Sequence, residues 1–350
     1  MEQALQQFRD RIRAASAAGT PLRFRGGGSK DWYGQSLQGE VLDTRAYAGI
    51  VDYDPTELVV TVRAGTPLAE LQSALAEKNQ FLAFEPPHFA EGSTVGGMVA
   101  AGLSGPRRFA VGAVRDFVLG ASIMDAQGQV LNFGGRVMKN VAGYDLSRLM
   151  AGSMGSLALL LEVSLKVLPR PFEETTLRLE LSQAAALQRL NQWGGQPLPV
   201  SGTLWHAGQL WLRLSGAKAA VNAARAVIGG EEVAAGSLWD DLREHKHAFF
   251  TQAPCWRLSL PSTAAALDLP SAQLIEWGGA LRWVCGDFEA RKMRELAAAA
   301  GGHASLFRGG DKQAGVFQPL SPPLLTLHRR LKEKFDPQGI FNPGRLYPEF

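Results

Sequence analysis

Two glycine-rich stretches in the first half of the chain constrain its fold more than any other feature. Residues 26–28 are all glycine and follow a short stretch at 22–25 that predicts a strand. Consecutive backbone N–H groups without side chains can curl around an anionic phosphate, and Arg25 and Lys30 add positive charge on either side. A tight turn with no ligand is the alternative interpretation of this first stretch.

The second stretch, residues 92–102, has a small residue at nearly every position. A flat or elongated ligand can lie against such a backbone, and Ser93 and Thr94 can donate hydrogen bonds to it. The alternative is a helix that packs closely on a neighbour through its glycines. Because both stretches occur in the same half of the chain, we favour one ligand that contacts both.

The usual nucleotide-binding fingerprints are missing from the sequence. No G-x-G-x-x-G follows a predicted strand, and no G-x-x-x-x-G-K-[ST] occurs. A Rossmann dinucleotide fold and a P-loop nucleotidase are therefore disfavoured. A cofactor that carries phosphates must then be held by another architecture.

Length, charge and cysteine content narrow the class of protein. The 350 residues suffice for two packed domains. The 36 Lys and Arg residues nearly balance 33 Asp and Glu residues, giving a net charge of +3 that does not indicate a nucleic-acid partner. Cys255 and Cys285 lie far apart with no C-x-x-C pairing, which predicts two unpaired core cysteines in a reducing compartment and no iron–sulfur site.

The amino-terminal residues predict an amphipathic helix rather than a secretion signal. Leu5, Phe8, Ile12 and Ala15 share one helical face, and charged residues interrupt the stretch. The longest uncharged window, residues 190–212, contains too many polar residues, glycines and prolines for a membrane span. We expect a cytoplasmic protein whose membrane association is at most peripheral.

Short strands recur over the first 170 residues, and two of them form a hairpin whose turn contains Asp125 and Gly128. Pro169 and Pro171 end the last of these strands and mark a domain boundary. The predicted strands span 22–25, 58–62, 118–124, 129–133 and 161–167.

A helix is predicted directly after the second strand. Thr66 can cap its first turn, Pro67 suits the first helical position, and Leu68, Leu71 and Leu75 repeat on one face.

Beyond the boundary, the order strand, helix, hairpin, helix occurs twice, which predicts an α+β domain built from two copies of one unit. A short helix is expected after Pro261 in the second copy. The first copy comprises 175–181, 182–192, 202–206, 209–214 and 217–227, and the second comprises 255–260, 274–277, 281–285 and 288–300.

A series of ordered motifs resembles the FAD domain of the vanillyl-alcohol oxidase class of flavoproteins, also called PCMH-type. The resemblance covers residues 20–170 and includes the carboxyl-terminal segment, which in this class returns to the FAD domain beside the flavin. The motifs lie at 25–29, 62–68, 92–97, 112–116, 155–162 and 335–345.

This resemblance implies an α+β fold with three parts: a two-subdomain PCMH-type FAD-binding domain at 1–170, a ferredoxin-like α+β cap domain at 171–318, and a C-terminal helix and tail at 319–350. Residues 139–146 and 301–308 look most like the E-subunit family of bacterial glycolate oxidases.

The resemblance also implies the cofactor-binding residues. Residues 25–30 would line the diphosphate of FAD, 92–97 and 101–104 the flavin and ribityl side, and 155–160 the adenine end. The residues expected to bind FAD are Arg25, Gly26, Gly27, Gly28, Ser29, Lys30, Gly92, Ser93, Thr94, Val95, Gly96, Gly97, Ala101, Gly102, Ser104, Gly155, Leu160 and Asn342.

Departures from the family pattern carry information as well. Members with covalent flavin place a histidine where this chain has Ser29, and the second attachment cysteine is missing, so the implied FAD is non-covalent. Relatives usually carry Glu and Gly at the positions of Met154 and Ala158, in the motif expected to contact adenine.

Catalytic residues are not evident from the sequence. Related subunits that oxidise hydroxy acids carry a histidine-rich metal motif, whereas the six histidines here are scattered. His245 and His247 fall in a predicted amphipathic helix, where their spacing makes the side chains diverge, so no metal site is expected. His303 is interpreted as a histidine at a domain edge or a flavin or partner contact, and Arg107 and Arg108 as solvated arginines or an anion site.

The function implied by the resemblance is that of an FAD-binding subunit that takes part in glycolate oxidation to glyoxylate. Its partners would be a sister catalytic flavoprotein and an iron–sulfur subunit. Two alternatives stay open: a stand-alone FAD oxidoreductase acting on another hydroxy acid or sugar, and an assembly subunit that keeps the fold without catalysis.

Overall fold

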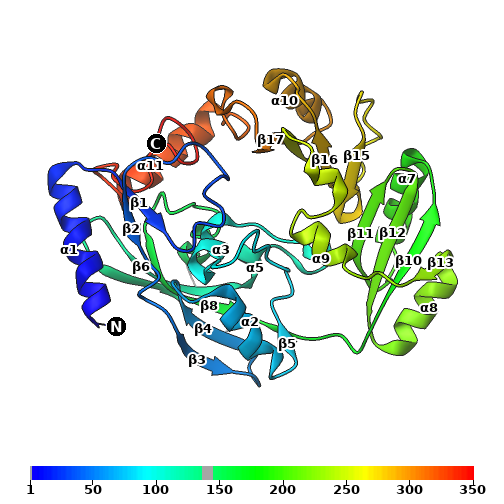
Figure 1. Ribbon diagram of the computed structural model, residues 1–350, viewed down its shortest axis with the longest axis horizontal. Coiled ribbons are helices and arrows are strands. Elements are labelled where there is room, and N and C mark those ends of the chain that lie inside the picture. Colours follow the sequence, from blue (N-terminus) through cyan, green and yellow to red (C-terminus); the bar gives the residue numbers. More distant parts are fainter. Residues whose placement is uncertain (1, 136–144) are drawn as a thin grey trace. The chain divides into compact units, whose positions relative to one another are not determined.

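The computed structural model describes residues 2–135 and 145–350, which form two compact units (Figure 1). Residues 139–144, which belong to one of the motifs above, lie outside the described residues. Unit 1 comprises Met1–Leu103, Ala113–Pro169 and Pro319–Phe350, and unit 2 comprises Ser104–Gly112 and Arg170–Gln318.

Unit 1 is built on a five-stranded antiparallel sheet with the strand order β3-β4-β8-β6-β7. The central strand β8 pairs with β4 and β6, carries alternating apolar residues and is buried along most of its length. The predicted hairpin is confirmed, since Asp125 and Gly128 join β6 to β7. The strands span Ile50–Asp54 (β3), Val59–Arg63 (β4), Val118–Met124 (β6), Val130–Gly134 (β7) and Leu159–Lys166 (β8).

The amino-terminal helix α1 (Glu2–Ala18) contributes one face to the core of unit 1, as predicted. Phe8, Ile12 and Ala15 are buried, and they pack in one cluster with residues of β1, β2, β6 and β8. Strands β1 (Leu22–Arg25) and β2 (Glu40–Asp43) form a separate parallel pair. The carboxyl-terminal tail adds to this pair, since Leu22 bridges to Phe341 in parallel.

Helix α2 (Leu68–Ala76) forms on the predicted apolar face, but the prediction for its first turn is wrong. Pro67 is the cap residue and Leu68 the first helical residue, and Thr66 does not cap the helix. The Thr66 hydroxyl instead donates to the Arg63 carbonyl at 2.7 Å and accepts from the Gly49 N–H at 2.8 Å. Thr66 therefore links the end of β4, at Arg63, to Gly49.

The other elements of unit 1 are short, apart from a C-terminal helix. They are the helices α3 (Val95–Ala101), α5 (Val114–Phe117), α6 (Leu146–Leu149) and α11 (Pro322–Phe335) and the strand pair β5 (Gln80–Phe81) with β9 (Leu168–Pro169).

Unit 2 contains one eight-stranded antiparallel sheet with the order β13-β10-β12-β11-β15-β16-β14-β17. Read from either edge to the centre, this order gives the last strand of a copy, then its first strand, then the two strands of its hairpin. The predicted duplication is therefore confirmed in the topology. The strands span Glu173–Glu180 (β10), Val200–His206 (β11), Gln209–Gly216 (β12), Glu231–Val233 (β13), Cys255–Ser259 (β14), Gln273–Glu276 (β15), Leu281–Cys285 (β16) and His303–Arg308 (β17).

Three helices cover one face of this sheet. Helices α7 (Gln183–Gly194) and α8 (Lys218–Ile228) pack on apolar residues of the first copy, and α10 (Ala290–Ala299) packs on those of the second. The helix predicted after Pro261 does not form, so the second copy has no counterpart of α7. The short elements are α4 (Arg108–Val111), α9 (Leu238–Arg243), η1 (Ala248–Thr251), η2 (Trp277–Gly279) and η3 (Lys312–Ala314).

The prediction of two unpaired cysteines is wrong. Cys255 on β14 and Cys285 on β16 face each other directly in the antiparallel register, with 4.2 Å between their Cα atoms, and they form a disulfide. Both residues are buried, as expected. Their pairing depends on strand register, which their separation along the chain does not reveal.

Candidate cofactor-binding site

The two glycine stretches lie against each other in unit 1. A Cβ atom added to Gly27 would lie 1.6 Å from the carbonyl oxygen of Gly92, and one added to Gly26 would lie 2.2 Å from the Thr94 hydroxyl oxygen. Both distances are far below van der Waals contact, so only glycine allows this approach. The glycines at 26 and 27 therefore explain both the tight packing of the first stretch and its position beside the second.

Both interpretations of the second stretch apply, at different residues. Helix α3 forms there, with Thr94 as its cap and Gly102 as a left-handed C-terminal residue. Gly96 is the packing glycine, because a Cβ at this position would lie 2.6 Å from the Cβ of Ala64. Gly97 is exposed and lines a cavity. Gly96 therefore lets α3 approach the end of β4, and Gly97 leaves the cavity-facing surface of the helix without a side chain.

The backbone N–H groups at the start of α3 are already used within the protein. Val95 donates to the Thr66 carbonyl at 2.9 Å, Gly96 to the Ala64 carbonyl at 2.8 Å, and Gly97 to the Thr94 hydroxyl at 3.2 Å. The second stretch therefore offers a flat surface rather than a set of free amides.

The first glycine loop, residues 26–29, is different. Within residues 2–135 and 145–350, none of its four backbone N–H groups has an acceptor. All four residues are half-buried. Consecutive N–H groups in this state form a concave donor surface that suits the oxygens of a phosphate.

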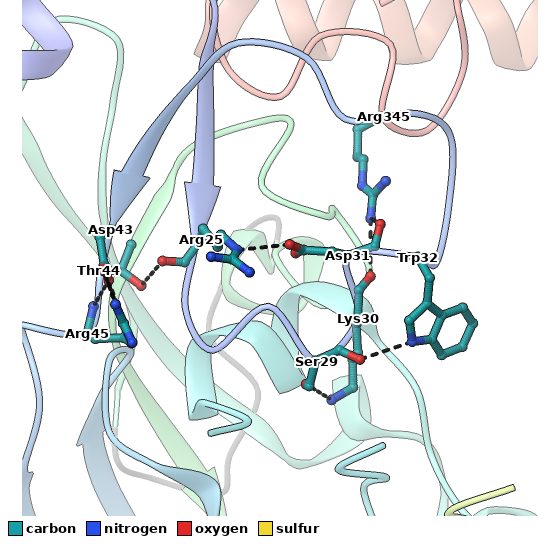
Figure 2. Close-up of polar contacts among 9 residues, drawn as sticks. All are labelled: Arg25, Ser29, Lys30, Asp31, Trp32, Asp43, Thr44, Arg45 and Arg345. Carbon is teal, nitrogen blue, oxygen red and sulfur yellow. Dashed lines mark hydrogen bonds and ion pairs between the residues drawn. The ribbon is translucent and has the colours of Figure 1, made fainter. Parts of the chain in front are cut away.

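Lys30 bridges the two glycine stretches. Its Nζ donates to the Ser93 hydroxyl at 3.1 Å, to the His88 carbonyl at 3.3 Å and to the Ser29 hydroxyl at 3.3 Å. The ammonium group is thereby fixed beside the donor surface of the first glycine loop. Figure 2 shows Lys30 next to Ser29 at the turn of this loop.

Arg25 and Asp31 form an ion pair across the first glycine loop, with 2.8 Å between Nε and Oδ2 (Figure 2). The Arg25 carbonyl also accepts from the Thr44 N–H at 3.0 Å, which ties the end of β1 to the residue after β2. Since Arg25 keeps 42% of its side chain exposed, its guanidinium can still contact a ligand.

Arg345, in the carboxyl-terminal tail, supports the same loop from the other end of the chain. Its guanidinium donates to the carbonyls of Lys30 at 3.2 Å and Asp31 at 3.1 Å (Figure 2). It also donates to the Gln35 carbonyl. Burial lowers the pKa of Arg345 to about 10, and the side chain stays charged at neutral pH. The tail thus fixes the backbone that follows the first glycine loop.

Asn342 connects β1 to the loop at residues 154–155. Its Oδ1 accepts from the Phe24 N–H at 2.9 Å, and its Nδ2 donates to the Met154 carbonyl at 2.5 Å. A Cβ on Gly155 would lie 2.6 Å from this Nδ2, so the predicted adenine motif packs directly on the tail. Asn342 therefore holds the site together through backbone groups.

Two adjoining cavities, of about 90 and 70 Å³, border these residues and share several lining side chains. The first contains the glycine loop and Lys30, and the second contains Gly155 and Leu160. The predicted residues that line at least one of them are Arg25, Gly26, Gly27, Gly28, Ser29, Lys30, Ser93, Thr94, Gly96, Gly97, Ala101, Gly155, Leu160 and Asn342.

Four of the residues expected to bind FAD do not line these cavities. Gly92 packs on Gly27, Val95 is fully buried, Gly102 ends α3, and Ser104 belongs to unit 2. Other lining residues are not among those expected individually to bind FAD. Ala158 and Leu159 fall within the range 155–160 expected at the adenine end, Ala64 and Arg345 within other motifs, and Ala100 within the second glycine stretch. Phe24, Asp31, Leu37, Thr44 and Met154 lie outside these ranges and carry no motif.

The interpretation of Arg107 as a solvated arginine is wrong. Arg107 is buried and its Nη2 lies 2.7 Å from Oε2 of Glu174, whereas Arg108 lies over the ring of Trp277 at 4.3 Å. Both arginines are used within unit 2, since their partners belong to the same unit.

Three histidines of unit 2, His206, His245 and His247, contact other rings. The helix predicted around His245 is also wrong, because α9 ends at Arg243. The His245 ring stacks on Phe250 at 4.0 Å, and burial together with the charges of Arg308 and Arg257 lowers its pKa well below the usual value. In the part of the chain that the structure describes, no group of three or more His, Cys, Asp or Glu residues is arranged to hold a metal ion.

His303 begins β17 at the surface of unit 2. Burial of the ring and the charge of Arg257 lower its pKa.

Across residues 2–135 and 145–350, no helix is long and apolar enough to cross a membrane.

Comparisons with known proteins agree with this architecture. The chain matches the family described as FAD binding domain over residues 3–134, and the family described as FAD linked oxidases, C-terminal domain, over residues 291–346. The fold and the matches define an FAD-dependent oxidoreductase of the FAD-linked oxidase class, with FAD as its cofactor. This agrees with the expected mixed helix and strand fold.

More specifically, the chain belongs to the family of glycolate oxidase subunit GlcE. The Escherichia coli (strain K12) protein of that name is 51% identical over 345 residues, which cover 98% of this chain and 97% of the relative. D-lactate dehydrogenase of Archaeoglobus fulgidus is 26% identical over 96% of this chain and 88% of its own length. Glycolate oxidase subunit GlcD of Bacillus subtilis (strain 168) is 34% identical, but only over 37% of this chain and 27% of its own.

Among solved structures, alkyldihydroxyacetonephosphate synthase has the same fold. The two chains superpose with a TM-score of 0.65 over 96% of this chain and 74% of the other, at 16% sequence identity. This similarity concerns the fold alone.

Proposed function

We propose that this chain is the FAD-binding E-type subunit of a glycolate oxidase complex. The observation that carries the proposal is the 51% identity with the E. coli subunit GlcE, which spans nearly the whole length of both chains. The complex would oxidise glycolate to glyoxylate, removing two electrons and two protons from the substrate. FAD, when bound, would supply the two-electron acceptor for this oxidation.

The residues present in unit 1 fit FAD. The four N–H groups of residues 26–29, which have no acceptor in the described part of the chain, would contact the diphosphate together with Lys30 and Arg25. The exposed surface of α3 around Gly97 and Ala101 would lie against the flavin and ribityl side, and the loop at Gly155 would contact the adenine end. Asn342 and Arg345 would position these loops rather than bind the cofactor.

The same cavities hold few groups that could act as a base. Among the residues that the structure describes, Asp31 is the only acidic one that lines them, and its carboxylate is paired with Arg25. This arrangement supports a division of labour in which a sister flavoprotein and an iron–sulfur subunit complete electron transfer. The chain would then bind FAD but depend on its partners for turnover. We propose further that membrane association is peripheral and runs through those partners.

The test is to purify the chain alone and together with the two proposed partners. FAD per chain is measured after acid release, and glycolate-dependent reduction of an artificial electron-accepting dye is measured for each preparation. We expect FAD to co-purify with the chain and dye reduction to require it. Full activity of the partners without this chain, or a folded chain that takes up no FAD, would reject the proposal.

A further inference from the structure

A third cavity lies entirely within unit 2, on the helix-covered side of its sheet. Its volume is about 610 Å³, several times that of either cavity beside the glycine loops. Pockets of roughly 300 to 1,000 Å³ are the usual size for small-molecule sites. The lining residues come from α4, α7, β11, β12 and η2 and from the loops beside them.

None of the described residues that line this cavity is charged. The charges of Arg108 and Arg257 are held over the ring of Trp277, at 4.3 and 5.2 Å, and neither residue is part of the lining. Transfer of a carboxylate or phosphate into such surroundings is strongly unfavourable without a partner of opposite charge. The cavity therefore suits neither a 2-hydroxy acid nor the diphosphate of FAD.

Aromatic side chains supply much of the lining. Trp193 and Trp277 are both buried, and Phe109 lies at the rim with 37% of its surface exposed. The Trp277 indole is fixed, because its Nε1 donates to the Gly105 carbonyl at 3.1 Å. Fixed indole rings favour stacked or edge-on contact with another flat ring.

Two lining side chains have hydrogen-bonding capacity left over. The hydroxyl oxygen of Thr203 accepts from the Gly278 N–H at 2.8 Å, while its own proton has no acceptor among the residues described. Nδ2 of Asn191 donates to the carbonyls of Leu187 and Ser262, each at 2.9 Å, while its Oδ1 has no donor among those residues. Thr203 is buried, so its unused proton is a stronger indication of a ligand than one at the surface would be.

We propose that this cavity is a second binding site, for an uncharged flat aromatic molecule that carries both a carbonyl acceptor and an N–H donor. The acceptor would take the Thr203 proton, the donor would bond to Oδ1 of Asn191, and the ring would pack between the tryptophans. This site lies in unit 2 and its chemistry differs from that of the FAD site, so it does not depend on the proposed glycolate function.

The probe is 1-naphthamide, with 1-naphthoate as a control ligand of nearly the same shape. Because Trp193 and Trp277 line the cavity, binding is measured as saturable quenching of tryptophan fluorescence and confirmed by calorimetry. We expect the amide to bind at least about tenfold more tightly than the carboxylate, since none of the described lining residues is a cation that could offset the loss of carboxylate hydration.

A matched pair of variants shows where the probe binds. Gly194 lines the cavity, a Cβ there meets no atom within 4 Å, and Gly194→Cys with N-ethylmaleimide would place a bulky group at that point after folding. Gly195→Cys, one residue further along, provides the control, because Gly195 is exposed and is not part of the lining. Cys255 and Cys285 are buried and paired, so they should not react.

We expect unlabelled Gly194→Cys to bind the amide normally and to lose about tenfold or more in affinity once labelled, because the adduct fills the cavity. Labelled Gly195→Cys should keep its affinity. The proposal is overturned if the amide does not bind, if the naphthoate binds equally well, or if labelling at both positions has the same effect. FAD content is measured in parallel, so a failure of this site is distinguishable from a failure of the proposed function.

Discussion

Nζ of Lys332 lies 2.8 Å from Oδ2 of Asp336, and both side chains are almost completely buried although the helix that carries Lys332 is largely exposed. The ammonium also donates to the carbonyls of Ser156 at 2.7 Å and Phe341 at 2.6 Å. The carboxylate accepts from the Phe341 N–H at 2.7 Å. This buried ion pair connects α11, the tail and the loop of the predicted adenine motif.

Asp336→Asn should strongly destabilise unit 1. The substitution leaves the Lys332 ammonium buried without its counter-charge, and loss of one partner of a buried pair costs about 3–5 kcal/mol. The free energy of unfolding, measured in urea, should fall by this order. FAD content should fall too, because the tail that carries Asn342 and Arg345 loses its attachment.

Glu333→Gln is the matched control, since Glu333 lies on the same helix and is exposed. Its free energy of unfolding should stay within about 0.5 kcal/mol of the unmodified chain. Equal stability of Asp336→Asn and Glu333→Gln would show that the ion pair does not hold the tail.

Gly27→Ala should separate the two glycine stretches. Its Cβ would lie 1.6 Å from the Gly92 carbonyl oxygen, and the loops must move apart to admit it. Overpacking of this kind costs about 1–3 kcal/mol. We expect a lower free energy of unfolding and little or no bound FAD, measured as the ratio of flavin to protein absorbance.

Gly195→Ala serves as the comparison, because a Cβ there meets only the Gln192 carbonyl oxygen, at an ordinary 3.7 Å. It should keep its FAD. Full FAD occupancy in Gly27→Ala would mean that close contact between the two stretches is not needed for the cofactor.

Lys30→Gln should weaken FAD binding and make it less sensitive to salt. A hydrogen bond to a charged group contributes about 1.5–3 kcal/mol, which corresponds to roughly a ten- to hundredfold change in the dissociation constant. Titration of the apoprotein with FAD at several ionic strengths measures both effects. Lys78→Gln, at an exposed position after α2, should change neither. If the two variants behave alike, Lys30 does not contact the diphosphate.

FAD should leave the protein completely when the chain is unfolded. Ser29 occupies the position where covalent relatives carry histidine, and a serine hydroxyl beside Lys30 offers no attachment of that kind. After acid precipitation we expect all of the flavin in the supernatant, identified as intact FAD by chromatography. Flavin that stays with the precipitated protein would show a covalent bond.

Much of the architecture follows from local patterns. The two glycine stretches, the amphipathic α1 and the duplication in unit 2 are visible in the sequence because each depends on spacing over a few residues. The glycines at 26 and 27 also indicate close contact, although the sequence does not say whether a ligand or another loop makes it.

Other parts of the site depend on contacts between residues that are distant in the chain. Arg345 donates to the carbonyl of Lys30, which lies 315 positions earlier in the chain, and no sequence motif predicts such a hydrogen bond. Lys332 looks like a surface lysine until its helix is placed against the tail. The sequence predicts Thr66 as a helix cap, but the Gly49 N–H donates to its hydroxyl oxygen in place of a helix N–H, and the hydroxyl proton goes to the Arg63 carbonyl.

Acid should selectively weaken unit 2 through Glu174. Burial alone would raise the pKa of this carboxyl. Arg213, Ser215 and Arg107 together lower the pKa by more than burial raises it, so the net pKa lies below the ordinary value of 4.5. The unfolded chain therefore binds the proton more readily, and the stabilisation from ionised Glu174 is present above pH 4.5 and lost as the pH falls through the lowered pKa. Glu174→Gln cannot titrate, so the gap in melting temperature between it and the unmodified chain should be wide at pH 7 and should narrow below pH 4.5.

Glu173→Gln, which removes a neighbouring carboxylate with no ion pair in the described part of the chain, should show no comparable gap. A constant gap for Glu174→Gln from pH 7 to pH 3 would contradict the role of its charge.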